Sequence, residues 1–156
     1  MTDKCNIKNS NVDFISALAV EHDDLVIATP AHLHIPVAPQ AGKELLIGKP
    51  LSVSLRGIEL LDRTIRERKL VYSVAYVLRH IVEIEALKQA LETGRFGRLL
   101  HIAIVKGPNF PVSRPNYTEN CYADHAEGGR AVQDGITHLI GVACWLAGPV
   151  KRLAGL

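Results

Sequence analysis

The chain of 156 residues has the length of one ordinary domain, long enough to bury a hydrophobic core without disulfide or metal crosslinks. Its composition, 47% hydrophobic and 22% charged, is typical of a globular protein and argues against disorder, collagen and coiled coil. The 18 basic and 16 acidic side chains give a net charge of +2, which argues against a nucleic-acid partner.

The compartment is indicated by two absences in the sequence. No apolar run approaches the roughly 18 residues of a membrane span, and the residues after Met1 lack the apolar stretch of a signal peptide. The three cysteines, Cys5, Cys121 and Cys144, form no CxxC pair, and an odd number argues against a disulfide framework. We therefore expect a soluble cytoplasmic protein with no membrane partner.

Three short apolar runs in the first half of the chain predict strands. Residues 24–28 and 44–47 are continuous apolar runs, each followed by a turn that contains proline, as in buried parallel strands. Residues 70–77 are rich in Val and Tyr, which favour a third strand.

Helical patterns separate these strands. Residues 31–41 predict a helix that ends at Gly42, and apolar residues at helical spacing over 51–65 predict another with Ser54 as its N-cap. Strand, helix, strand, helix, strand is the order of a parallel sheet with right-handed crossovers, so the fold class is α/β.

The second half has a different pattern. Apolar residues from Ile84 to Leu91 predict a helix, residues 99–105 a strand, and residues 107–127 a long loop that contains three prolines. A final helix is predicted over 131–147, and residues 150–156 resemble the beginning of another strand.

The final helix carries the first candidate site. It is apolar on almost every side and is therefore expected to be buried, yet Asp134 and His138 lie one turn apart on it. One hypothesis is an acid–base histidine oriented by a carboxylate. The alternative is an aspartate stabilised by the helix dipole and a hydrogen-bonded core histidine.

The strand ends carry the second candidate site. Thr29 and Pro30 follow the first strand, and Lys49 and Pro50 follow the second, where ligands bind in open parallel sheets. A lysine there could polarise or protonate a substrate oxygen. The alternative is a solvated surface lysine before a turn proline.

A metal site is not predicted. The candidates would be His32, His34 and His125 with Cys121 and Cys144, but none has the tight spacing typical of zinc ligands.

Taken together, eight segments resemble the Gfo/Idh/MocA family of NAD(P)-dependent oxidoreductases, named for glucose–fructose oxidoreductase and inositol dehydrogenase. The resemblance covers about residues 12–156 and keeps the order and spacing of the family. The segments are Leu25-Val26-Ile27-Ala28-Thr29-Pro30, His32-Leu33-His34, Ala41-Gly42-Lys43, Lys49-Pro50, Gly94-Arg95-Phe96-Gly97-Arg98, Gly128-Gly129, Asp134 to His138, and Trp145-Leu146-Ala147-Gly148.

The resemblance implies the C-terminal half of a Rossmann-like parallel-sheet domain (1–78), joined to the start of the family's α/β C-terminal domain (79–156). It also implies NAD or NADP as cofactor and hydride transfer to or from a hydroxyl-bearing carbon of a sugar or cyclitol.

Specific roles follow from the same resemblance. Thr29, Pro30, His34, Lys49 and Pro50 are implied to bind the cofactor, with His34 near its ribose or nicotinamide. The implied catalytic residues are Lys49, at the seam between nicotinamide and substrate, and the pair of Asp134 and His138, with His138 as acid–base group. The resemblance further predicts that Lys49 and His138 line one cleft.

Departures from the family pattern lead to a competing hypothesis. No GxGxxG turn occurs, family members are about twice as long, and Gly48 stands where the family has Glu. We therefore expect a truncated family member that alone binds a dinucleotide at about millimolar strength or weaker. Its cut sheet exposes an apolar edge, which favours self-association into a homo-oligomer. The competing hypothesis is a non-catalytic remnant that acts, if at all, as a binding or structural module.

Overall fold

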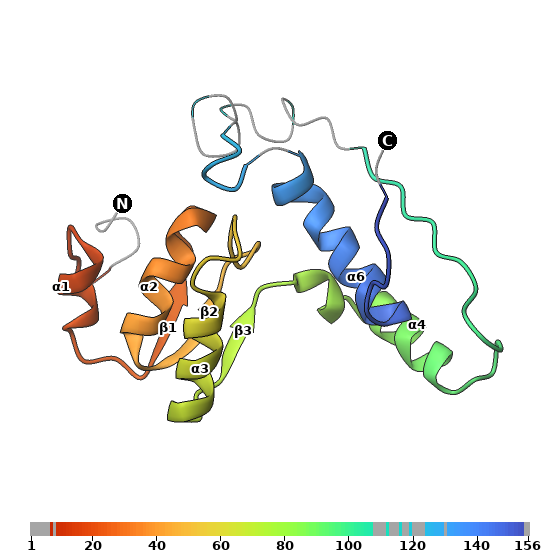
Figure 1. Ribbon diagram of the computed structural model, residues 1–156, viewed down its shortest axis with the longest axis horizontal. Coiled ribbons are helices and arrows are strands. Elements are labelled where there is room, and N and C mark those ends of the chain that lie inside the picture. The colour runs from red at the N-terminus through yellow and green to blue at the C-terminus, as the bar shows by residue number, and fades with distance from the viewer. Residues whose placement is uncertain are drawn as a thin grey trace. The chain divides into compact units, whose positions relative to one another are not determined.

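The chain forms two compact units, Met1–Val74 and Ala75–Leu156, in the computed structural model (Figure 1). The structure describes residues 7, 9–107, 112, 116, 119, 124–129 and 131–154. Most of the predicted loop over 107–127 therefore lies outside the described residues, as do Cys5 and Cys121.

The first unit is built on a parallel sheet of three strands in the order β1-β2-β3 (Figure 1). The strands are β1 (Asp24–Ile27), β2 (Glu44–Ile47) and β3 (Tyr72–Val74). The register pairs Ile27 with Ile47, and Ile47 with Val74, so the carboxyl ends of all three strands lie at one edge. The predicted α/β fold is confirmed, although the third strand is shorter than its Val- and Tyr-rich pattern.

Four helical segments accompany the sheet. They are α1 (Phe14–Leu18), the 3-10 turn η2 (Ala31–Leu33), α2 (His34–Ala41) and α3 (Ile58–Arg68). As predicted, α2 ends at Gly42, whose positive φ of 64° suits a residue without Cβ.

The prediction for the start of α3 is wrong. The helix begins at Ile58 after Gly57, which has a φ of 83°, and Ser54 lies in the preceding turns. There the Ser54 hydroxyl oxygen accepts a hydrogen bond from the Arg56 amide at 3.3 Å. A serine hydroxyl can accept a backbone hydrogen bond in a turn as well as at a helix N-terminus, and Ser54 does so in a turn.

The core of the first unit lies between the sheet and its helices. Seven buried side chains form one cluster, and α2 and α3 both contribute to it while contacting each other. The cluster consists of Ile27, Ile35, Val37, Ala38, Leu45, Ile47 and Leu61. Alternate residues of β2 face this core, since Leu45 and Ile47 are buried and Glu44 and Leu46 are exposed.

The second unit consists of helices and extended chain. Its elements are the 3-10 turn η3 (Val77–His80), α4 (Val82–Glu92), the π-helical turn η5 (Ala131–Ile136) and α6 (Thr137–Ala147). The predicted helix near Ile84 and the end of the last helix at Gly148 are confirmed. The last helix begins with a π turn, which its apolar pattern did not indicate.

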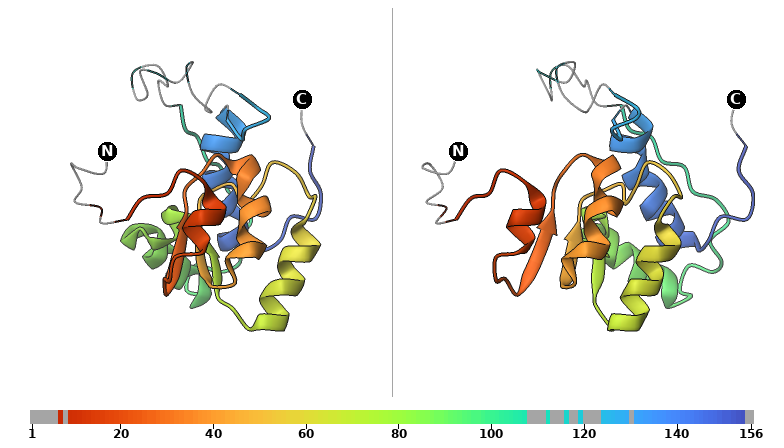
Figure 2. Two further views of the ribbon diagram at one scale, coloured as in Figure 1. Left: turned by 90° about the vertical axis from the view of Figure 1, so that its left-hand side faces the viewer. Right: turned by 60° about the vertical axis from the view of Figure 1, so that its left-hand side comes forward.

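Two strand predictions fail in this unit. Residues 99–105 form extended chain, and none of the views draws a strand there (Figures 1 and 2). Residues 150–154 also form no strand. A strand needs a neighbour to accept its backbone hydrogen bonds, and the structure pairs neither segment among the described residues.

The last helix is also more exposed than predicted. Val142 is buried, but Ile136 and Ile140 are 41% and 50% exposed, and Val132 is exposed as well. Within the described part of the chain, no helix is long and apolar enough to cross a membrane.

Candidate functional site

The carboxyl edge of the sheet brings together the loops that follow β1 and β2. Thr29 and Pro30 follow β1, while Gly48, Lys49 and Pro50 follow β2. Because β1 and β2 are parallel and in register, both loops leave the sheet at the same edge. The Gly48 amide donates a hydrogen bond of 2.8 Å to the Ile27 carbonyl, which ties the two strand ends. Thr29 is exposed and Lys49 is half-buried.

His34, the first residue of α2, lies beneath this edge. Its side chain is 1% exposed, and the ring reaches from one loop to the other. The Nε2 atom lies 2.9 Å from the Thr29 carbonyl oxygen, and Nδ1 lies 2.9 Å from the Pro50 carbonyl oxygen. The structure therefore brings Thr29, His34 and Pro50 together by direct contacts.

The chemistry of this edge fits the nicotinamide half of a dinucleotide. A half-buried ammonium at Lys49 and the exposed hydroxyl of Thr29 can face an amide, a ribose or a substrate oxygen. The pyrophosphate half of a dinucleotide is usually held by a Gly-rich turn at a helix N-terminus. The 156 residues contain no GxGxxG segment, so the fit extends to the nicotinamide half alone.

In the second unit, a glycine turn leads into the helix that carries Asp134 and His138. The Gly129 amide donates to the Asp124 carbonyl oxygen at 2.8 Å, and Gly128 has a φ of 93°. The Gln133 side-chain amide nitrogen donates to the carbonyls of His125 and Gly129 at 3.0 Å. These hydrogen bonds join the turn to the start of the helix.

Asp134 and His138 lie on the two sides of the junction between η5 and α6. Asp134, in the π turn, is buried at 7% exposure, and His138, in the first turn of α6, is half-buried. Single π turns within helices occur frequently at functional sites. The structure keeps these two predicted site residues on one continuous helix.

An aromatic and a cationic side chain pack around His138. The Tyr76 and His138 rings meet edge to face with centroids 6.1 Å apart, and the Tyr76 hydroxyl lies 3.2 Å from Thr137 Oγ1. Arg79 lies over the Tyr76 ring at 5.4 Å and donates to the Gly141 carbonyl at 3.3 Å. The sequence did not point to these two residues. Tyr76 lies in the Val- and Tyr-rich run 70–77, which indicated only a strand, and Arg79 lies just beyond it.

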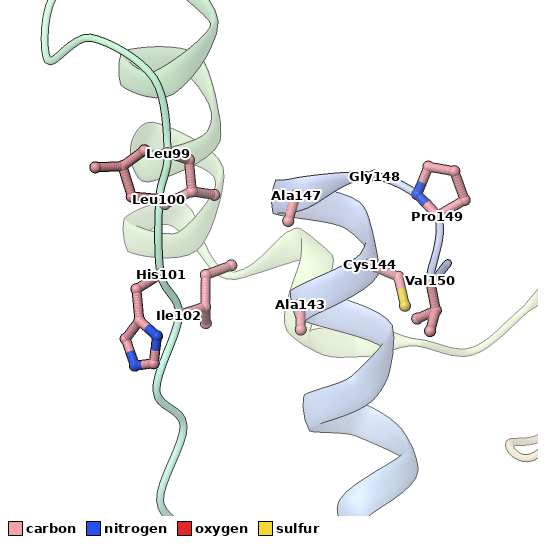
Figure 3. Close-up of a pocket in the computed structure, with 10 residues that line it drawn as sticks. All are labelled: Leu99, Leu100, His101, Ile102, Ala143, Cys144, Ala147, Gly148, Pro149 and Val150. Carbon is pink, nitrogen blue, oxygen red and sulfur yellow. The ribbon is translucent and has the colours of Figure 1, made fainter. Parts of the chain in front are cut away.

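Each unit also contains a cavity. In the second unit a cavity of about 280 Å³ lies between residues 99–102 and the end of α6, with Ala143, Cys144 and Ala147 on its wall (Figure 3). In the first unit a cavity of about 490 Å³ lies beside α2 and is lined by His32 and Arg56 among others. Lys49, Asp134 and His138 line neither cavity. Among the described residues, no group of three His, Cys, Asp or Glu side chains is placed to hold a metal ion.

Comparison with known proteins shows which family the chain resembles. Residues 84–156 match the model of the GFO/IDH/MocA C-terminal domain. Over 131 residues, 78% of this chain and 32% of the relative, the chain is 28% identical to the levoglucosan dehydrogenase of Pseudarthrobacter phenanthrenivorans. Residues 84–156 thus match the C-terminal domain of the Gfo/Idh/MocA family.

Solved Gfo/Idh/MocA structures support the same fold. A levoglucosan dehydrogenase, in complex with NADH and levoglucosan, matches with a TM-score of 0.70 and 26% identity over 94% of this chain and 41% of its own. The myo-inositol 2-dehydrogenase of Lactobacillus plantarum matches with a TM-score of 0.76 and 17% identity over 94% of this chain and 44% of its own. The chain thus spans about a third of its curated relative and under half of these Gfo/Idh/MocA structures.

Proposed function

We propose that this chain supplies the nicotinamide side and the acid–base helix of an NAD(P)-dependent oxidoreductase. Residues 1–78 form the partial dinucleotide-binding domain and residues 79–156 the partial substrate domain. The observation that carries the proposal is the strand edge, where Lys49 lies next to Pro50 and the buried His34 joins Pro50 to Thr29. The relationship to levoglucosan dehydrogenase supports a sugar or cyclitol-like substrate with a hydroxyl-bearing carbon.

At the strand edge, Thr29, Pro30, Lys49 and Pro50 bind the nicotinamide half of NAD or NADP, and His34 contributes to this site from beneath, through the loops that it contacts. When bound, the cofactor supplies the hydride acceptor or donor. The Lys49 ammonium is a compact point charge that donates to a substrate or ribose oxygen and stabilises negative charge there.

On the helix of the second unit, His138 moves the proton of the substrate hydroxyl. A histidine is suited to this work because its charge changes near neutral pH. Asp134 stabilises the positive charge that the imidazole acquires when it accepts the proton, as an oriented carboxylate does in other acid–base pairs. Tyr76 helps to orient the imidazole through the perpendicular packing of the two rings.

A second candidate function is a non-catalytic module, which one observation favours: the sequence contains no GxGxxG turn. Without those backbone donors, two or three charge-assisted hydrogen bonds to the pyrophosphate are lost, and dinucleotide binding falls to about millimolar or weaker. This module would bind a partner or ligand through the same surfaces without turning it over.

Turnover by the purified chain separates the two functions. NAD or NADP is supplied at about millimolar concentration, to offset weak binding, with levoglucosan or myo-inositol as substrate, and reduced nicotinamide is followed by absorbance. We expect turnover that falls about a hundredfold or more in Lys49→Ala and in His138→Ala.

The matched control is Lys43→Ala, since Lys43 is exposed and lies just before β2, at the other end of the strand from Lys49. This variant should keep the activity of the parent chain. Absent turnover with every substrate, together with no saturable change in nicotinamide fluorescence on titration with NADH or NADPH, would favour the non-catalytic module.

A further inference from the structure

The buried imidazole of His34 contacts both loops at the strand edge. Each of its ring nitrogens lies 2.9 Å from a backbone carbonyl oxygen, one at Thr29 and one at Pro50. His34 and Ile47 are the largest side chains of the described chain that are fully buried. A polar ring this deep is stabilised only when its nitrogens find partners, and here both partners belong to the loops above it.

The ring also lies against Gly48. A Cβ atom added at Gly48 would come within 3.2 Å of the His34 Cε1 atom and 3.3 Å of the Ile27 carbonyl oxygen. The imidazole therefore lies beside the chain on both sides of Lys49, close to where a side chain of residue 48 would lie and in polar contact with Pro50. One side chain borders both neighbours of Lys49.

Chemistry limits how the ring can serve the two loops. Both partners are carbonyl oxygens, which accept hydrogen bonds and cannot donate them. A neutral imidazole carries one N–H and donates to one loop, whereas an imidazolium donates to both. In either form the ring occupies the space between the loops and sets their separation.

We propose that His34 is a positioning residue that fixes the Lys49 loop against the Thr29 loop, so that the Lys49 ammonium is presented at the carboxyl edge of the sheet. The inference rests on the proposed function and deepens it: His34 serves the cofactor through the two loops that it joins. At 1% exposure, its ring has almost no surface left for a ligand.

The test compares three substitutions of His34 in the full chain. His34→Phe keeps a ring of similar size and removes both polar contacts, so a purely packing role would be preserved. His34→Asn and His34→Gln each return one amide donor, near the place of Nδ1 and of Nε2 respectively. His32→Phe is the matched control, because His32 lies two residues earlier on the wall of the cavity beside α2.

The reporter is the Gly48 amide, whose hydrogen bond to the Ile27 carbonyl closes the strand edge. In His34→Phe we expect Gly48 to exchange its amide hydrogen about tenfold faster or more, while Leu46 inside β2 keeps its rate. His34→Asn or His34→Gln should restore part of the protection, and His32→Phe should change nothing at Gly48.

The second reporter is the Lys49 amine, measured by acetylation rate relative to Lys43 in the same molecule. Repositioning of the loop should change this ratio in His34→Phe and return it toward the parent value in the amide variants. Neither reporter requires cofactor or turnover, so a chain without dehydrogenase activity would fail the proposed function and still test this inference.

Unchanged Gly48 exchange and an unchanged Lys49 ratio in His34→Phe would overturn the proposal. Equal acceleration of Gly48 and Leu46, or failure of all three His34 variants to fold while His32→Phe folds, would also overturn it. Either of these results would assign His34 to general stability.

Discussion

The unit Met1–Val74 buries a cluster of seven hydrophobic side chains, whereas the described part of the unit Ala75–Leu156 buries one, Val142. In the first unit, the strand edge that carries Lys49 stands on a packed sheet whose residues have little freedom to move. In the second, the helix that carries His138 leaves Val132, Ile136 and Ile140 exposed and is held by contacts with Tyr76 and Arg79.

This difference shows two ways of holding a functional side chain. A packed core positions the strand edge through many small contacts, so the loss of one contact leaves most of the others in place. A few polar and aromatic contacts position the helix, so the loss of one removes a larger share of what holds it. The regions with few buried apolar contacts are also those expected to open locally at low free energy.

The largest loss of stability is expected from a substitution that leaves a cavity in the packed core. Ile47→Ala should lower the free energy of unfolding by about 2–5 kcal/mol, because Ile47 is 1% exposed at the centre of the cluster. Denaturant unfolding measures the loss. The matched pair is Val37→Ala and Val142→Ala, since these valines are 6% and 7% exposed and Val37 belongs to the cluster. Val142→Ala should cost less than Val37→Ala, and equal costs would contradict the contrast between the units.

A smaller loss of stability is expected when alanine replaces a glycine with positive φ, and each unit offers one such glycine. Gly57→Ala should cost roughly 1–2 kcal/mol for the backbone, plus the cost of a Cβ placed 2.6 Å from Ile35 Cγ2. Gly94→Ala carries the backbone cost alone, because a Cβ there meets nothing within 4 Å. The shift of the unfolding midpoint in each variant measures the difference, and a larger loss at Gly94 would disprove it.

The smallest effect concerns Tyr72 at the sheet of the first unit. Its hydroxyl donates to the Ala38 carbonyl at 3.1 Å, and burial raises the pKa of Tyr72 above its ordinary value, against a smaller lowering by Arg68. The unfolded tyrosine ionises first as pH rises, so this stability is present below about pH 10 and is lost above it.

Tyr72→Phe should therefore cost about 1 kcal/mol near neutral pH and less in alkali. Denaturant unfolding of both chains across this pH range measures the difference. A difference that grew with pH would show that the ionised form is the one the folded state favours.

Much of the first unit could be predicted because its signals are local. The apolar runs that became β1 and β2 are closed by prolines, and Gly42 ends α2 where a positive φ is needed. The start of α3 could not be predicted from Ser54, because the helix begins where Gly57 turns the chain, and nothing near Ser54 signals that geometry.

The remaining differences depend on partners distant in the sequence. Residues 99–105 have the composition of a strand, but composition supplies no neighbour to pair with. The contacts of His34 reach a carbonyl 16 residues away, and Tyr76 meets a hydroxyl 61 residues away. Residue identity at 34 and 138 could be matched to the family, whereas the contacts around them could be learned only from the structure.

The close approach of His34 to Gly48 limits which residues position 48 can hold without rearrangement. A Cβ atom there would lie 3.2 Å from the His34 Cε1 atom and 3.3 Å from the Ile27 carbonyl oxygen, so one of these neighbours would have to shift by a few tenths of an ångström. The Gly48 amide also donates to that same carbonyl at 2.8 Å. Any larger side chain at this position is therefore coupled to the placement of the imidazole and to the hydrogen bond that joins the two strand ends.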